Sequence, residues 1–163
     1  MARSPESEPL PWPMFAPPPA WFALALAAGW AIDRWEAHAP VLPPFAAKGR
    51  VALASMLAAI AVGVVASALY QFRRAQATIL PVGRTRRLAT GGVYRFTRNP
   101  MYLAMTVLYL AAAIWLDTAW PVATLPIALF VIAGIFVPYE ERRMQRLFGP
   151  EYDLYRSRVR RWL

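Results

Sequence analysis

Charged residues are missing from four long stretches of the chain. These uncharged windows are residues 9–32, 51–72, 99–116 and 118–139, and a charged residue follows each of them. About 20 apolar residues are needed to cross the roughly 30 Å hydrocarbon core of a membrane. Windows 51–72 and 118–139 are long enough, whereas 99–116 is short. The pattern predicts an all-α integral membrane protein with about four transmembrane helices.

The first window is the weakest helix former. Six prolines fall between positions 9 and 19, which leaves only residues 20–32 as an uninterrupted helical segment, because proline removes a backbone donor and breaks helices. We therefore expect a Pro-rich segment over residues 1–18. After it we expect a helix that is tilted, shallow or extended past Asp33.

Amphipathic helices are expected after the fourth window. Gly149 followed by Pro150 is typical of one helix ending and another beginning. Such helices lie on the membrane as an anchor or fold back over the bundle as a lid. In the last helix, aromatic and apolar residues recur three or four apart with arginines between them: Tyr152, Tyr155, Val159 and Trp162.

The arginines lie mainly in two segments. Seven arginines and no acidic residue separate the second and third windows: Arg73, Arg74, Arg84, Arg86, Arg87, Arg95 and Arg98. Seven more follow Tyr139: Arg142, Arg143, Arg146, Arg156, Arg158, Arg160 and Arg161. The positive-inside bias of membrane proteins places both segments in the cytoplasm. Four spans then predict a multi-pass protein with both termini cytoplasmic and the link around Asp117 outside.

The composition narrows the class of protein further. Hydrophobic residues make up 58% of the chain and charged residues 17%, with a mean hydropathy of +0.34 and a net charge of +9, whereas disordered chains combine low hydrophobicity with high charge. There is no cysteine, and the single His38 cannot form a histidine metal site alone, so we expect no metal. Membrane orientation and anionic lipids account for the arginines, and no nucleic-acid recognition module accompanies them. We expect membrane lipids and no nucleic acid as partners; the oligomeric state stays open.

A first polar cluster lies just before the third window. Asn99 followed by Pro100 is a helix start signal, with Asn as the N-cap and Pro at the first helical position. Backbone N–H groups at this helix start, with Arg95 and Arg98 beside them, would seat a carboxylate or phosphate. The alternative is a capped span flanked by arginines that reach toward the membrane surface.

A second polar cluster, Glu140 and Glu141, follows the fourth window directly. Acidic residues at the C-terminal end of a helix oppose its dipole, so a helix that ended here would be destabilised by them. Either the helix continues and the glutamates pair with arginines, or they receive a cation or the hydroxyl groups of a ligand.

The order of these motifs carries a family resemblance. Along the chain come Gly92-x-Tyr94-Arg95-x-x-Arg98-Asn99-Pro100-x-Tyr102, a hydrophobic hairpin, Glu140-Glu141-Arg142, Phe148-Gly149-x-Glu151-Tyr152-x-x-Tyr155 and the terminal Val159-Arg160-Arg161-Trp162-Leu163. This arrangement resembles the integral membrane methyltransferases, which include the isoprenylcysteine carboxyl methyltransferases and the phospholipid N-methyltransferases. The resemblance covers residues 72–163, the expected catalytic core of a single domain over residues 1–163.

The resemblance implies a cofactor, an acceptor and a set of site residues. It implies that S-adenosylmethionine is held between the segment that enters the hairpin and the double-glutamate segment that leaves it. The acceptor would be membrane-embedded or amphipathic, either a lipid amine or an isoprenylcysteine-like carboxylate. The cofactor-binding residues carried over are Tyr94, Arg98, Asn99, Pro100, Tyr102, Glu140 and Glu141. Of these, Glu140 and Glu141 are also the catalytic candidates, as cofactor ligands first and as a base second.

One departure from the family pattern bears on the acceptor. Many members have His where this chain has Asn99, and an asparagine cannot take up a proton, so catalysis by a histidine base is excluded here. The Asn-Pro-Met-Tyr sequence also occurs in phospholipid methyltransferases, which favours a lipid acceptor. Two other functions stay open. The protein could be a reductase related to the NADPH-dependent membrane sterol reductases, or a non-enzymatic membrane scaffold or accessory subunit.

Overall fold

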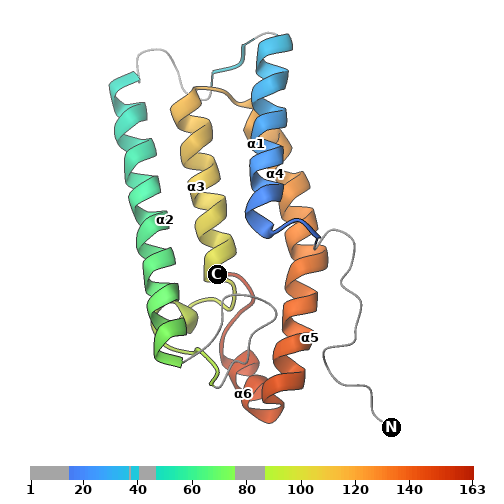
Figure 1. The fold of residues 1–163 in the computed structure, drawn as a ribbon. Helices are drawn as coiled ribbons and strands as arrows, with labels where there is room; N and C mark the ends of the chain where they lie inside the picture. The colour runs from blue at the N-terminus through green and yellow to red at the C-terminus, as the bar shows by residue number, and fades with distance from the viewer. Residues whose placement is uncertain (1–14, 37, 41–46, 76–86) are drawn as a thin grey trace.

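The computed structural model describes residues 15–36, 38–40, 47–75 and 87–163 (Figure 1). Within these residues every regular element is a helix, which confirms the all-α class there. The elements are α1 (Pro18–Trp35), α2 (Ala47–Ala75), the 3₁₀ turn η3 (Gly92–Arg95), α3 (Pro100–Leu116), α4 (Trp120–Val131), the π-helical turn η4 (Ile132–Phe136), α5 (Val137–Phe148) and α6 (Pro150–Arg158). Most of the expected Pro-rich segment lies outside the described residues, as do Arg84 and Arg86.

The long helices run alternately up and down the molecule (Figure 1). α1 packs against α4, and α2 packs against α3. α4, η4 and α5 follow one another without a break and extend below the other helices, where the chain turns into α6. The base of the bundle therefore gathers η3, the start of α3, α5, α6 and the C-terminus.

Two of the described helices are long and apolar enough to cross a membrane, Gly49–Ala75 and Trp120–Phe148. They correspond to the second and fourth uncharged windows. The helix Pro100–Leu116 is apolar but shorter, like the third window. α1 runs past Asp33 to Trp35, which is one of the outcomes expected for the first window. The apolar helices indicate a protein that associates with a membrane.

Close backbone approach and a few buried hydrogen bonds hold α1, α3 and α4 together. A Cβ added at Gly29 would lie 2.5 Å from Pro121 Cα, so α1 meets α4 closely at this glycine. Thr124 Oγ1 donates to Ala25 O at 2.8 Å, and the Tyr109 hydroxyl donates to Pro121 O at 2.8 Å. Polar groups need such partners in an apolar interior. The three helices are therefore fixed in register by contacts that their apolar surfaces alone do not provide.

The upper end of the bundle is tied by a separate polar cluster. Thr118 Oγ1 donates to Asp33 Oδ1 at 2.8 Å, and His38 Nδ1 lies 3.0 Å from both Asp33 carboxylate oxygens. Arg50 forms an ion pair with Asp117. Among the described residues, no group of three or more His, Cys, Asp or Glu is placed to hold a metal ion. His38 thus belongs to a contact that links the end of α1 to the α3–α4 turn.

The π-helical turn η4 lies in the middle of the last long helix. The Val137 N–H bonds to Ile132 O, five residues back instead of four. Pro138 follows at once, and a proline has no N–H and crowds the preceding turn of a helix. One extra residue in a turn rotates everything after it by about 100° around the helix axis. η4 therefore decides which way Glu140 and Glu141 face.

Candidate functional site

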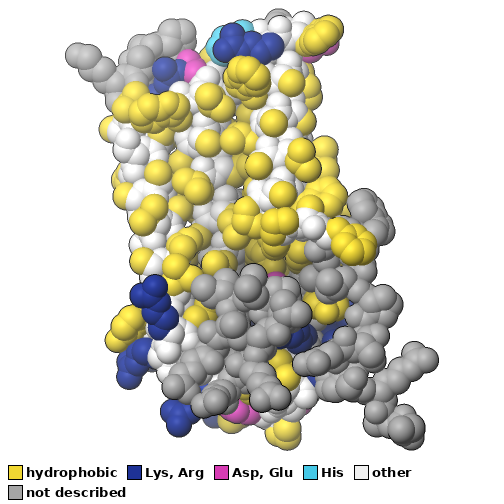
Figure 2. Space-filling view, in the orientation of Figure 1, with side chains coloured by type: hydrophobic (Ala, Val, Ile, Leu, Met, Phe, Trp, Pro, Cys, Tyr) yellow, Lys and Arg dark blue, Asp and Glu magenta, His cyan; other side chains and the backbone are white. Residues whose placement is uncertain are grey.

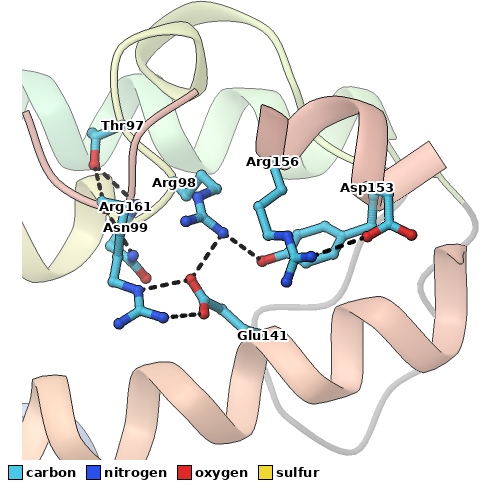
Figure 3. Close-up of polar contacts among 8 residues, drawn as sticks. Thr97, Arg98, Asn99, Glu141, Asp153, Arg156 and Arg161 are labelled. Atoms are coloured by element: carbon cyan, nitrogen blue, oxygen red, sulfur yellow. Dashed lines mark hydrogen bonds and ion pairs between the residues drawn. The ribbon is translucent and has the colours of Figure 1, made fainter. Parts of the chain in front are cut away.

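The two polar clusters come together at the base of the bundle. The Tyr102 hydroxyl donates to Glu140 Oε1 at 2.6 Å. Arg98 Nη1 lies 2.9 Å from Glu141 Oε1 (Figure 3). Both contacts join the segment that enters α3 to α5, which the chain reaches only after the hairpin. The structure thus brings together residues that the sequence analysis grouped as one site; their cofactor role stays a prediction.

Local backbone geometry places Tyr94 close enough to this site to interact electrostatically with Glu140. Gly92 has φ +56°, and a Cβ there would lie 2.7 Å from Gln71 Nε2, so glycine lets the chain turn tightly against α2. The Tyr94 ring is buried against Phe72, with ring centres 5.5 Å apart. The Tyr155 hydroxyl donates to Tyr94 O at 2.8 Å, and burial raises the pKa of both tyrosines. Tyr94 therefore supports the site by packing η3 between α2 and α6.

Asn99 occupies the N-cap position of α3, as predicted, but the expected capping by its side chain is wrong. Asn99 does precede Pro100 at the helix start, but it makes no side-chain capping hydrogen bond. Its Nδ2 instead donates to Arg161 O at 2.9 Å, and its backbone N–H donates to Thr97 Oγ1 at 3.1 Å. The C-terminal segment supplies a carbonyl, in a partly buried contact, that accepts from the Asn99 amide in place of a capping interaction. The Asn99 side chain therefore joins the start of α3 to the C-terminal segment and does not cap its own helix.

Arg98 connects three segments of the chain. Its Nη1 pairs with Glu141 and donates to the Tyr152 hydroxyl at 3.3 Å, while its backbone N–H donates to Arg160 O at 3.0 Å. Burial raises the pKa of Tyr152, and the hydrogen bond from Arg98 offsets part of that rise. The Arg98 Nε is buried and has no hydrogen-bond partner among the described residues. The guanidinium therefore keeps a donor for a further acceptor.

The two adjacent glutamates have different partners. Glu141 receives Arg161 Nε at 3.0 Å and Nη2 at 2.6 Å, one on each carboxylate oxygen, in addition to Arg98. Glu140 is half-buried and accepts from Tyr102. α5 continues to Phe148, so the first alternative holds for Glu141: the helix extends and this glutamate pairs with arginines. Glu140 therefore accepts from a neutral hydroxyl, and the charge of Arg143 acts on it as well.

The C-terminal segment enters the site, which sequence reasoning missed. Thr97 Oγ1 donates to Arg161 O at 3.0 Å (Figure 3), so Thr97 and Asn99 both hold the same carbonyl. The sequence signals for this segment were the terminal Arg160-Arg161-Trp162 motif and the expected anchor or lid helix, but neither Arg161 nor Thr97 was named as a site residue. A buried threonine beside a helix start and a basic chain end are too common to be recognised without the fold.

The last helix is shorter than the aromatic pattern suggests. α6 ends at Arg158, so the prediction that Val159 and Trp162 continue its stripe is wrong. Tyr152 and Tyr155 are buried as the pattern implies. Val159 and Trp162 lie in the segment after α6, where Trp162 packs against the core cluster that includes Tyr102. The chain leaves the helix because its backbone bonds instead to the segment before α3.

Comparisons with known proteins place this chain in a family. A family model described as "Phospholipid methyltransferase" matches residues 49–151. An uncharacterized protein of Haemophilus influenzae (strain ATCC 51907 / DSM 11121 / KW20 / Rd) is 35% identical over 63 residues, which are 39% of this chain and 100% of that protein. No solved structure matches the chain. Because the family match spans more than half of the chain and includes both polar clusters, the protein belongs to the phospholipid methyltransferase family.

Proposed function

We propose that the protein is an integral membrane enzyme that transfers a methyl group from S-adenosylmethionine to a membrane-embedded or amphipathic acceptor. The observation that carries the proposal is the pair of contacts Tyr102–Glu140 and Arg98–Glu141 at one end of an apolar bundle. Family membership supports methyl transfer in general. The cofactor and the acceptor are the steps that the proposal adds.

The residues at the site fit this cofactor chemically. S-adenosylmethionine carries a carboxylate, an ammonium group and ribose hydroxyls. Arg98 has a buried Nε with no partner among the described residues, and a guanidinium is suited to a carboxylate. The carboxylates of Glu140 and Glu141 are suited to an ammonium group and to hydroxyls. Donor and acceptor groups therefore stand on facing segments, as a zwitterionic ligand requires.

The chain's own residues mainly need to align and shield the reactants. When bound, the cofactor supplies an electrophilic methyl group on a sulfonium, so the protein gains most by orienting the acceptor and excluding water. Glu141 is held between Arg98 and Arg161 and suits a binding role. Glu140, which accepts a hydrogen bond from the neutral Tyr102 hydroxyl and interacts electrostatically with Arg143, is the group we assign to receive a proton from an amine acceptor.

We favour a lipid amine as the acceptor over an isoprenylcysteine-like carboxylate, because the family model that matches the chain is described as phospholipid methyltransferase. On the face drawn in Figure 2, apolar side chains cover the length of the helices, and basic side chains lie at their upper and lower ends. Large exposed apolar residues on α3 and α4 include Leu108, Ile127 and Phe130. An acceptor with acyl chains would therefore reach the site laterally from the bilayer, with its polar head at the level of Glu140.

The same arrangement supports a four-span topology with both termini in the cytoplasm. Arg73 and Arg74 end α2 at the base of the bundle, where α5 and α6 contribute further arginines. At the upper end, Arg50 is paired with Asp117, and the Arg34 guanidinium lies 5.1 Å from the Trp30 ring centre. The excess of basic residues at the base supports placing the site on the cytoplasmic side.

Equilibrium binding in detergent tests the proposal against the alternatives. The full chain is titrated with S-adenosylhomocysteine and, separately, with NADPH. Saturable binding of S-adenosylhomocysteine alone supports the methyltransferase. Binding of NADPH alone would instead support a relative of the membrane reductases, and binding of neither would favour a scaffold. A lipidomic comparison of membranes with and without the protein then identifies the methylated acceptor.

A further inference from the structure

We propose that Arg161 is a positioning residue that holds the two walls of the cofactor site at a set distance, an inference that rests on the function proposed above. Its guanidinium donates one hydrogen bond to each carboxylate oxygen of Glu141 on α5. Its backbone carbonyl receives hydrogen bonds from Thr97 and Asn99, which precede α3. A single residue near the chain end thus bonds to both walls (Figure 3).

Charge balance alone does not explain the pairing of Arg161 with Glu141. Arg98 already lies 2.9 Å from Glu141 Oε1, so the carboxylate would keep a cationic partner without Arg161. In this pair the Arg161 side chain is 44% exposed and the Glu141 side chain 15%, and an ion pair with one exposed partner contributes only modestly to stability. What the second guanidinium adds is orientation, because two parallel hydrogen bonds fix the plane of a carboxylate.

The backbone around Arg161 is itself held firmly. Arg160 O accepts from the Arg98 N–H at 3.0 Å, Arg161 O has two donors, and Trp162 packs against the core. The backbone of Arg161 is therefore fixed in position, and few side-chain conformations allow its guanidinium to reach Glu141. Loss of the guanidinium would leave this backbone in place and would free Glu141 to turn toward Arg98.

The inference makes a directional prediction. If Arg161 orients Glu141 for the cofactor, removal of its guanidinium weakens cofactor binding. If the guanidinium instead occupied the place of the cofactor's ammonium group, its removal would strengthen binding. The direction of the change therefore distinguishes a positioning residue from a competing one.

The experiment measures S-adenosylhomocysteine affinity and thermal midpoint of the full chain in detergent. Arg161→Met is expected to raise the dissociation constant about tenfold, with the thermal midpoint close to that of the parent. Arg161→Lys keeps the positive charge but cannot donate two parallel hydrogen bonds, so its affinity is expected to lie between those of the parent and Arg161→Met. Arg158→Met, at an exposed arginine that ends α6, is the matched control and is expected to bind like the parent.

A double-mutant cycle shows whether Arg161 acts through Glu141. In a Glu141→Gln background, Arg161→Met is expected to change affinity less than twofold, because the carboxylate that it orients is gone. Equal losses in both backgrounds, or parental or tighter binding by Arg161→Met, would overturn the inference. If Arg161→Met does not fold, Arg161→Lys and its cycle with Glu141→Gln carry the same decision. Failure of the parent to bind S-adenosylhomocysteine would instead overturn the proposed function, and this inference with it.

Discussion

Tyr102 and Glu140 are 38 positions apart in the chain, yet the tyrosine hydroxyl donates a 2.6 Å hydrogen bond to the glutamate. Tyr102 lies in the first turn of α3, and Glu140 lies in the first turn of α5. The bond therefore joins the two arms of the hairpin at its open end. It also places a carboxylate beside the helix start where the first cluster gathers.

Removal of the Tyr102 hydroxyl tests this bond. Tyr102→Phe is expected to lower the free energy of unfolding by about 1–3 kcal/mol, because the half-buried Glu140 loses a hydrogen-bond donor. We also expect slower methyl transfer, since Glu140 is no longer oriented. The measurements are thermal midpoint and methyl transfer rate. The control is Tyr70→Phe, whose residue is 57% exposed; a Tyr102→Phe variant that resembles it in both measurements would contradict the assignment.

The two glutamates are expected to respond differently to neutralisation. Glu141→Gln is expected to weaken S-adenosylmethionine binding by about 1.5–3 kcal/mol through loss of a charge-assisted hydrogen bond. Glu140→Gln is expected to lower the rate of methyl transfer to an amine more than it lowers affinity, because an amide accepts no proton. Titration calorimetry measures the cofactor affinity of both variants, and kinetic assays measure their rates of methyl transfer. Equal effects on affinity and rate in the two variants would reject this division of roles.

Substitutions of Asn99 test its link to the C-terminal segment. Asn99→Asp removes the donor to Arg161 O and sets a carboxylate against that carbonyl, so we expect about 1–3 kcal/mol of lost stability together with weaker cofactor binding. Asn99→Ala is expected to lose less stability, since no charge is introduced. Asn99→His, which retains a ring N–H, is expected to keep partial binding. If Asn99→Asp has the affinity and the thermal midpoint of the parent, the hydrogen bond from Asn99 to the Arg161 carbonyl does not support the site.

The close approach of α1 and α4 predicts a steric effect at Gly29. Gly29→Ala places a methyl group 2.5 Å from Pro121 Cα, so the helices must separate, at a cost of about 1–3 kcal/mol. Gly63→Ala on α2 is the matched control, because nothing lies within 4 Å of its added Cβ and alanine favours a helix. Thermal midpoints in detergent are expected to fall for Gly29→Ala and to hold or rise for Gly63→Ala. The reverse order would show that α1 does not pack there.

The proposed topology makes a prediction about the chain end. A reporter fused after Leu163 is expected to be active on the cytoplasmic side, because the base of the bundle holds most of the arginines. If the reporter is instead active outside the cell, the topology is reversed and the site lies on the other face of the membrane.

Local sequence was enough to locate the helices. Uncharged windows coincide with α2, α3 and the helix that starts at Trp120, and the Pro100 and Gly149–Pro150 signals mark real helix boundaries. These features depend on runs of apolar residues and on proline and glycine, whose effects act within a few residues. The order of motifs along the chain was likewise enough to indicate the family that the comparison confirms.

Only the tertiary structure decided what each site residue contacts. The amide of Asn99 has a partner 62 residues away, and Glu141 bonds to Arg161 across 20 residues. Whether an asparagine caps its own helix or binds a distant carbonyl depends on which acceptor the fold brings near. The π-helical turn η4 sets the rotation of α5 about its axis, and this rotation turns Glu140 toward Tyr102 and Glu141 toward the arginines. Sequence determined which residues were available, and packing of the helices and the C-terminal segment determined their partners.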